Sequence, residues 1–359
     1  MIRQLAKDKI RVKPTSLVSV SYVVSLIKKF YPFIDTPQVI FDFTGIIYAK
    51  SVATAVFARE LREIILYRVE HHLISQAEVN IDLDTTCRYL DHIGFFDFIG
   101  VQHKGSLKKI RKQLEQQVEG RIPIIEYNYL YFQRGYGFDP MDESMSYYQA
   151  EEGASGIIEK ESIRIVQALF GHDAGLGVLA YCIREALRNC YEHSKADKYY
   201  VLGQTWNNGK SELVIMDYGN GLLKTLKRKY PDLQNERDAI QRAVEPGVSE
   251  TDFNGKNVYT NSGFGLYVLC QLALRFGKIY IASNESMVAY GKAIKVHDVK
   301  SKGTMVAMQF KKLPEDFGAA LEEIIKKGRE RAQTGTYPIS PSLLTRQYTK
   351  NGVVLEVGK

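Results

Sequence analysis

The chain has 359 residues, of which 45% are hydrophobic and 25% charged, enough for two domains with their own cores. This composition excludes collagen-like and low-complexity classes, and a folded chain is expected. The formal net charge of +7 is modest, and the basic stretches at residues 1–30 and 104–121 lack the interleaved aromatic residues of a base-stacking surface, so we expect a solvated surface without a nucleic-acid partner.

Residues 1–103 are expected to form a small α/β domain, because segments with helical periodicity alternate with short apolar runs. The expected elements are, in order, a helix over residues 19–31, a strand over 39–43, a helix over 51–70, a strand over 78–83 and a short helix that ends near Gly94. Asp84, Thr85 and Thr86 are suited to cap the start of that last helix.

Residues 157–312 are expected to form a second α/β domain. Strands are predicted over residues 199–205, 212–217, 279–283 and 305–310, and helices over 179–193 and 266–275. The sequence Asn207-Asn208-Gly209, between the first two strands, is typical of a hairpin turn. It is preferred to a P-loop because five residues, not four, separate Gly203 from Gly209.

Two segments lie outside these domains. Residues 104–156 are interpreted as a connector, with a basic helix to Glu119, a β-like run over 122–130 and a Tyr- and Gly-rich loop over 135–140. Residues 313–359 are expected to contain a helix over 317–329 and a polar tail.

The cysteines and the hydropathy pattern indicate in which compartment of the cell the protein is expected. The four cysteines are scattered without a Cys-x-x-Cys pair, so a zinc ribbon is excluded and buried thiols are expected. No apolar run reaches the roughly 18 residues that a membrane-spanning helix needs, and residues 1–14 lack the apolar core of a secretory signal. We therefore expect a cytoplasmic protein without membrane association.

The helix expected over residues 179–193 carries a polar stripe separate from its apolar one. Glu185, Asn189 and His193 are spaced by four residues, which places successive side chains about 40° apart around the helix. An Asn oxygen suits Mg²⁺, and a Glu one turn earlier is placed to orient or deprotonate a nucleophile beside that ion. Taken alone, such a stripe is more often a solvated helix face.

An acidic turn follows the apolar strand expected over residues 212–217. In Asp217-Tyr218-Gly219-Asn220-Gly221, the glycines let a flat heteroaromatic ring approach the backbone, and the carboxylate can accept a hydrogen bond from an exocyclic amine. An ordinary turn of Asp and Gly explains the same residues.

A glycine-rich turn precedes the helix expected over residues 266–275. In Asn261-Ser262-Gly263-Phe264-Gly265-Leu266, the glycines at the helix start favour polyphosphate binding to free N–H groups. Val268 stands where a dinucleotide fingerprint requires its third glycine, so a Rossmann turn is excluded.

In order and spacing, these motifs together resemble the conserved boxes of the GHKL ATPases, a superfamily that includes gyrase B and histidine kinases. The matching stretches are Glu185-Ala-Leu-Arg-Asn189, Asp217-x-Gly219-x-Gly221, Gly263-Phe264-Gly265-Leu266 and Lys302-Gly303-Thr304. The resemblance implies an α/β (α+β) fold whose C-terminal part is a Bergerat-type two-layer sandwich binding ATP and Mg²⁺.

The resemblance also implies roles for single residues. Asn189 would hold Mg²⁺ and Asp217 the adenine amine, and Glu185 would be the catalytic residue. The ATP-binding set is Asn189, Asp217, Gly219, Gly221, Gly263, Phe264, Gly265, Leu266 and Thr304. Residues 222–260 would form a mobile lid, and its lysines are either phosphate contacts or part of a solvated face: Lys224, Lys227, Lys229 and Lys256.

Within the superfamily the chain looks closest to the anti-sigma-factor serine kinases, because Glu185 precedes Asn189 by four residues and His193 follows by four. His172 is expected in a loop, so histidine autophosphorylation is not expected. The resemblance implies a bacterial Mg-ATP-binding regulatory protein that hydrolyses ATP or phosphorylates Ser/Thr of a partner. The alternatives are a non-catalytic, ATP-dependent interaction module and an ATP-gated nucleic-acid-handling protein.

The N-terminal half resembles a STAS domain, through residues 39–45 (Val-Ile-Phe-Asp-Phe-Thr-Gly) and the later run Ile93-Gly94-Phe95-Phe96. STAS domains usually show Asp-Ser-Ser-Gly where this chain has Lys50-Ser51-Val52-Ala53. Ser51 is therefore either a phosphoacceptor or a helix N-cap serine. The resemblance implies a protein partner that binds this half, and the oligomeric state stays open.

Overall fold

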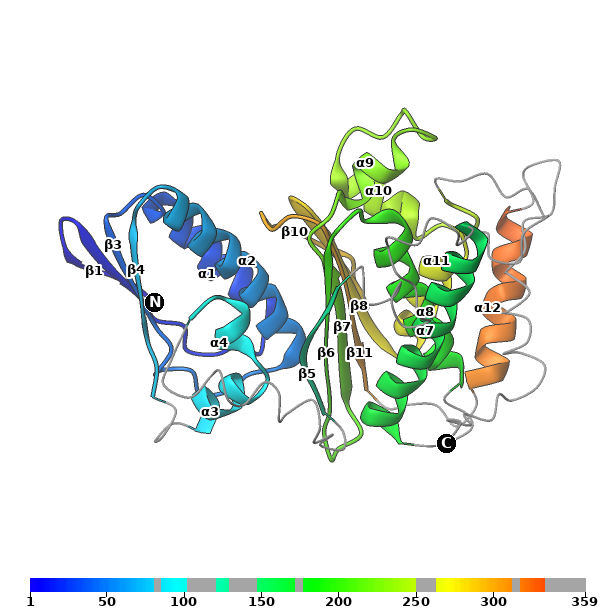
Figure 1. Cartoon of the computed structure of the whole chain (residues 1–359), viewed down its shortest axis with the longest axis horizontal. Coiled ribbons are helices and arrows are strands. Elements are labelled where there is room, and N and C mark those ends of the chain that lie inside the picture. The colour runs from blue at the N-terminus through cyan, green and yellow to red at the C-terminus, as the bar shows by residue number, and fades with distance from the viewer. Residues whose placement is uncertain are drawn as a thin grey trace.

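The chain folds into a mixed α/β structure with two sheets. The computed structural model describes residues 1–80, 85–101, 121–128, 147–171, 177–249, 263–311 and 317–332. Figure 1 shows the smaller sheet at the N-terminal side, the larger sheet beyond it, and α1 and α2 between the two. Across these described ranges, no helix combines the length and apolarity that a bilayer span requires.

The smaller sheet has the strand order β1-β2-β3-β4. Its hairpin β1–β2 is antiparallel, and β2, β3 and β4 run parallel. The elements of this half are β1 (Ile2–Ala6), β2 (Lys9–Val12), α1 (Val20–Phe30), η1 (Tyr31–Phe33), β3 (Gln38–Asp42), α2 (Ser51–Glu70), β4 (Ile74–Glu78), α3 (Thr85–His92) and α4 (Phe95–Phe98). The helix predicted over residues 51–70 is confirmed at both ends.

The strand predicted over residues 78–83 is placed wrongly. The chain pairs with β3 over Ile74–Glu78 and has no strand at residues 79 and 80, while residues 81–84 lie outside the described part. The alternation of Val79, Ile81 and Leu83 suggested a strand, but tertiary pairing selects the preceding segment, where the register aligns Ile74 with Gln38.

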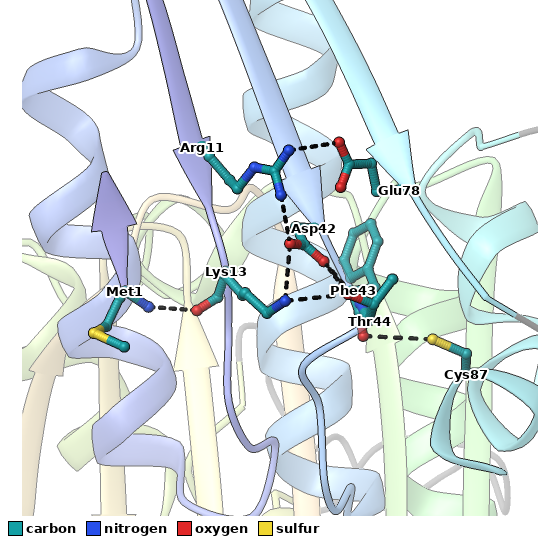
Figure 2. Close-up of polar contacts among 8 residues, drawn as sticks. All are labelled: Met1, Arg11, Lys13, Asp42, Phe43, Thr44, Glu78 and Cys87. Carbon is teal, nitrogen blue, oxygen red and sulfur yellow. Dashed lines mark hydrogen bonds and ion pairs between the residues drawn. The ribbon is translucent and has the colours of Figure 1, made fainter. Parts of the chain in front are cut away.

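The carboxyl ends of the parallel strands carry an ion cluster around Asp42 (Figure 2). Asp42 is only 1% exposed, and its Oδ2 lies 3.0 Å from Lys13 Nζ and 3.2 Å from Arg11 Nη1. The other oxygen accepts hydrogen bonds from the N–H (3.0 Å) and hydroxyl (2.5 Å) of Thr44. Burial acts to raise the pKa of Asp42, but these hydrogen bonds and the Lys13 charge outweigh it, so the pKa lies below its usual value.

Asp42→Asn is expected to lower the free energy of unfolding by about 2 kcal/mol at pH 7, because hydrogen bonds to a charged group are lost. A carboxyl whose folded-state pKa is lowered stabilises the fold fully above the unfolded-state pKa of about 3.9, and this contribution is lost as pH falls from there through the lower folded-state pKa. Urea unfolding of wild type and Asp42→Asn at pH 7 measures the loss of stability, and the same comparison at pH 3 measures how much smaller that loss becomes. The exposed Asp8→Asn is the control, and an equal loss in the two variants would contradict the prediction.

The larger sheet has the order β10-β9-β8-β11-β7-β6-β5, with every neighbouring pair antiparallel. Its strands are β5 (Arg121–Asn128), β6 (Lys198–Thr205), β7 (Ser211–Asp217), β8 (Gly277–Ser283), β9 (Ser286–Tyr290), β10 (Lys295–Asp298) and β11 (Thr304–Phe310). The helices of this half are α7 (Tyr147–Phe170), α8 (Gly177–His193), α9 (Gly221–Leu226), α10 (Glu236–Ala243), α11 (Gly265–Phe276) and α12 (Phe317–Ala332). Figure 1 shows α7, α8, α11 and α12 over one face and α9 and α10 at one end.

Several expectations for this half are met and others need correction. The four predicted strands and the Asn-Gly hairpin are present, with Gly209 at φ +74°. The proposed connector, however, contributes an edge strand, β5, to the larger sheet, and α7 begins at Tyr147, before residue 157. The expected lid loop contains α9 and α10. The helix expected to end at Glu119, the loop over 135–140, His172 and the polar tail lie outside the described residues.

The central strands of the larger sheet, β6, β7 and β11, are buried on both faces. Tyr199, Val201 and Ile215 pack with the helices α7, α8 and α11, whereas Tyr200 and Val214 pack with the N-terminal half. Because both faces are covered, the strands read as nearly continuous apolar runs rather than as an alternating pattern.

Helix α2 lies at the contact between the two halves and is buried on nearly all sides over its first three turns. Lys50 occupies its N-cap position and makes no side-chain hydrogen bond there. Instead, the carboxylate of Glu212 on β7 accepts the N–H of Val52 at 2.8 Å. A side chain of the larger sheet therefore caps a helix of the other half.

Candidate functional site

A pocket opens between α8, the ends of β7 and β11, the start of α11, and the α9–α10 segment. The residues that line it are Ala186, Asn189, Cys190, His193, Ser194, Ile215, Asp217, Gly221, Leu222, Thr225, Leu226, Ala243, Val248, Ser249, Gly263, Gly265, Leu266, Thr304 and Val306. The structure thus brings together most of the site residues predicted from separate motifs, namely Asn189, Asp217, Gly221, Gly263, Gly265, Leu266 and Thr304.

Asp217 is the buried acid of this pocket, with 2% exposure, at the carboxyl end of β7. Its Oδ1 accepts hydrogen bonds from the N–H groups of Gly219 (2.8 Å) and Thr304 (3.2 Å). Oδ2 accepts a longer contact from the Cys190 thiol at 3.7 Å. Burial raises the pKa of Asp217 above its usual value, although these hydrogen bonds oppose the shift. The backbone therefore fixes one oxygen and leaves the other facing a thiol in the pocket wall.

Two glycines are required by the way segments meet around the pocket. A Cβ at Gly219 would lie 2.0 Å from the carbonyl oxygen of Ser194, so only glycine lets this turn approach the end of α8. Gly263 has φ +68°, and a Cβ there would lie 2.6 Å from the backbone of Gly247. Gly219 thus supports the pocket from behind without lining it, whereas Gly263 forms part of its wall.

Glu185, predicted as the catalytic residue, does not line the pocket. It is 5% exposed, and its Oε1 accepts a hydrogen bond from Arg184 Nη2 at 2.6 Å. Its Oε2 lies 2.7 Å from where a Cβ on Gly265 would be, so the carboxylate lies behind the start of α11. Arg184 Nε is also 3.6 Å from Glu159. In this arrangement the Glu185 carboxylate is held in an ion-paired cluster.

Phe264 and three of the lid lysines also lie away from the pocket lining. Phe264 is fully buried, its ring centroid 6.0 Å from that of Tyr267, and it packs toward α12 near Gly328. Lys224, Lys227 and Lys229 are absent from the lining, which α9 and α10 supply mainly with apolar side chains. Lys256 lies outside the described residues. The described lining contains no lysine or arginine.

A buried polar network supports the Asp217 side of the pocket and was not found from the sequence. Glu236 at the start of α10 accepts hydrogen bonds from Ser283 Oγ (2.5 Å), the N–H of Leu223 (3.1 Å) and Asn284 Nδ2 (2.6 Å). Asn284, at φ +44°, in turn accepts the N–H of Gly303 at 2.9 Å. The only local signal is the preference of Asn for positive φ in a turn, because the partners are distant in sequence.

Glu236→Gln is expected to lower the free energy of unfolding by about 2 kcal/mol, because an amide NH₂ would face donors where a carboxylate accepts. Denaturant unfolding measures the change. The exposed neighbour of the network, Glu285→Gln, serves as the control and should change stability by less than about 0.5 kcal/mol. Equal stability of wild type and Glu236→Gln would show that the Glu236 carboxylate does not stabilise the fold through this network.

Ser51, a phosphoacceptor or N-cap candidate, is the first residue of α2 and is 0% exposed. The N-cap interpretation is wrong, because Lys50 takes that position. The Ser51 hydroxyl is also removed from solvent, because Ser51 is buried next to Val52, whose N–H donates to Glu212 of the larger sheet.

Comparison with protein-family models, with curated proteins and with solved structures finds no match to this chain.

Proposed function

We propose that the chain is a regulatory protein that binds Mg-ATP in the pocket at Asp217. Residues 157–312 would be a GHKL-type nucleotide-binding domain, and residues 1–103 a STAS-like domain that contacts a protein partner. The observation that carries the proposal is the buried carboxylate of Asp217 at the edge of a largely apolar pocket. A carboxylate in this position can accept a hydrogen bond from the exocyclic amine of a purine, while apolar side chains cover the ring faces.

The other wall of the pocket suits the polyphosphate end of the same ligand. Gly263 and Gly265 lie at the start of α11, a helix of 12 residues whose first N–H groups favour an anion. Asn189 on α8 lines the pocket, and its amide oxygen would suit a Mg²⁺ that takes its other ligands from phosphates and water. These two features support a nucleotide with phosphates over a nucleoside alone.

Calorimetric titration with ATP, ADP and GTP, each with and without Mg²⁺, tests the binding proposal. We expect ATP and ADP to bind, Mg²⁺ to tighten ATP, and GTP to bind more weakly, because the guanine carbonyl would face the Asp217 carboxylate. Absence of heat for every adenine nucleotide would refute the proposal.

The fate of the γ-phosphate decides among three forms of this function. ATP labelled at the γ-phosphate would yield label in solution for a hydrolase, label on Ser or Thr of a partner for a kinase, and unchanged ATP for a binding module. The position of Glu185, ion-paired to Arg184 and outside the pocket lining, favours the binding module as the second candidate. A catalytic role would require the carboxylate to leave that ion pair.

A further inference from the structure

The segment over residues 299–303 leads directly into Thr304, one of the residues that line the pocket. It is held on one side by the β8–β9 turn, where the N–H of Asn284 donates to Gly303 O at 2.9 Å. Asn284 Oδ1 accepts the N–H of Gly303, also at 2.9 Å. We call residues 299–303 the closing segment. Its conformation sets the position of the Thr304 N–H, which donates a hydrogen bond to Asp217.

The N-terminal half holds the closing segment from its other side. Glu60 of α2 accepts the N–H of Ser301 at 2.9 Å and that of Lys300 at 3.0 Å. The guanidinium of Arg59 donates to the carbonyl oxygen of Lys302. Both side chains belong to residues that are only 1% exposed. The partners are separated by more than two hundred positions in the sequence, so these contacts form only when the two halves dock.

Arg59 also lies close to the turn that carries Asp217. The Arg59 guanidinium is 5.8 Å from the ring centroid of Tyr218, the residue that follows Asp217. A Cβ at Gly303 would lie 2.2 Å from the carbonyl oxygen of Asp217, so the closing segment touches this turn directly. A displacement of residues 300–302 would therefore move the N–H of Thr304, which donates to the Asp217 carboxylate. It would also move the backbone of Asp217, which Gly303 touches.

The contacts of Arg59 and Glu60 strongly constrain the conformation of the closing segment. A buried carboxylate or guanidinium without hydrogen-bond partners is costly, so Arg59 and Glu60 favour the one conformation of the closing segment that satisfies them. They do so without touching the pocket, because neither is among its lining residues.

We propose that Arg59 and Glu60 are positioning residues for the nucleotide site, so that the N-terminal half completes the purine end of the pocket through the closing segment. Docking of α2 and occupancy of the pocket then stabilise each other, since coupling between two sites is reciprocal. This inference rests on the proposed binding of an adenine nucleotide.

The test uses the full chain and its Glu60→Gln variant, with Glu60→Asp as the conservative replacement. Glu70→Gln, at the exposed end of the same helix, is the matched control. ADP affinity is measured by calorimetry, and amide hydrogen exchange is followed at Lys300 and Ser301, whose N–H groups bind Glu60. We expect Glu60→Gln to weaken ADP binding about tenfold, within the range of typical coupling energies, with partial recovery in Glu60→Asp.

Hydrogen exchange separates positioning from general destabilisation. In the wild type, Mg-ADP should slow exchange at Lys300 and Ser301, whereas in folded Glu60→Gln these amides should exchange faster and respond less to nucleotide. If the amides exchange faster but ADP affinity stays within twofold of wild type, the inference is overturned and the nucleotide proposal stands. If wild type binds no adenine nucleotide, the functional proposal fails, and this inference fails with it. Should Glu60→Gln not fold, ADP affinity and amide exchange at Lys300 and Ser301 are measured in Arg59→Lys instead. Weaker ADP binding with faster exchange would support the inference, and unchanged ADP affinity with faster exchange would overturn it.

Discussion

Asp217→Asn is expected to weaken ATP binding by about 100-fold, which corresponds to the roughly 2.7 kcal/mol of a hydrogen bond to a charged, buried acceptor. The substitution keeps the shape of the side chain, and its carbonyl oxygen can still accept the N–H groups of Gly219 and Thr304. The new NH₂ group would then face the purine amine as a second donor. Calorimetric titration of ATP into both proteins measures the loss.

The control for this variant is Asp232→Asn, which changes an exposed acid on the segment between α9 and α10. It should bind ATP as the wild type does. Circular dichroism establishes that Asp217→Asn remains folded before affinities are compared. Unchanged ATP affinity in folded Asp217→Asn would show that the carboxylate does not recognise the base.

If the wild type consumes ATP and the Glu185 carboxylate leaves its ion pair with Arg184 to do so, Glu185→Gln is expected to reduce ATP turnover by about 10² to 10⁴-fold, the usual contribution of a general base. ATP binding should change by less than about threefold, because Glu185 lies behind Gly265 and outside the pocket lining. The distinguishing feature is thus a loss in kcat with little change in nucleotide affinity. Release of labelled phosphate and calorimetry measure the two quantities.

Glu192→Gln is the control for Glu185→Gln, because Glu192 lies on the same helix, pairs with Arg188 and does not line the pocket. Its turnover should match that of the wild type. Retained turnover in Glu185→Gln would remove Glu185 from the reaction. A wild type that binds ATP and never consumes it would instead establish the binding module, with Glu185 a structural ion-pair partner of Arg184.

The pocket-lining residues Asp217, Gly263 and Gly265 could be singled out from the sequence because each belongs to a local motif. Asp217 ends an apolar strand, and Gly263 and Gly265 lie at a helix start, so neighbouring residues alone indicate a turn and a helix start. The structure brings Asp217, Gly263 and Gly265 to one pocket. Sequence could not indicate that Glu185 would be turned toward Arg184, because that depends on how closely α11 approaches α8.

The fold was harder to predict where short or distant segments pair. Strands β9 and β10 have only 5 and 4 residues and were missed, because such short runs carry little periodic signal. β5 was assigned to a connector, although its pairing with β6 makes it part of the larger sheet. The contacts of Glu212, Arg59 and Glu60 join residues far apart in sequence, and no local pattern encodes them.

Burial of strands β6, β7 and β11 on both faces also constrains how this chain can change over evolution. The outer face, with Tyr200, Leu202 and Val214, is covered by α2, whose side chains Val52 and Val56 are equally buried. A change in volume on either side leaves a void or an overlap that only a matching change opposite can relieve. Residues of α2 and of β6, β7 and β11 should therefore vary together among descendants of a common ancestor, and the two halves should be inherited as a unit rather than recombined with unrelated domains.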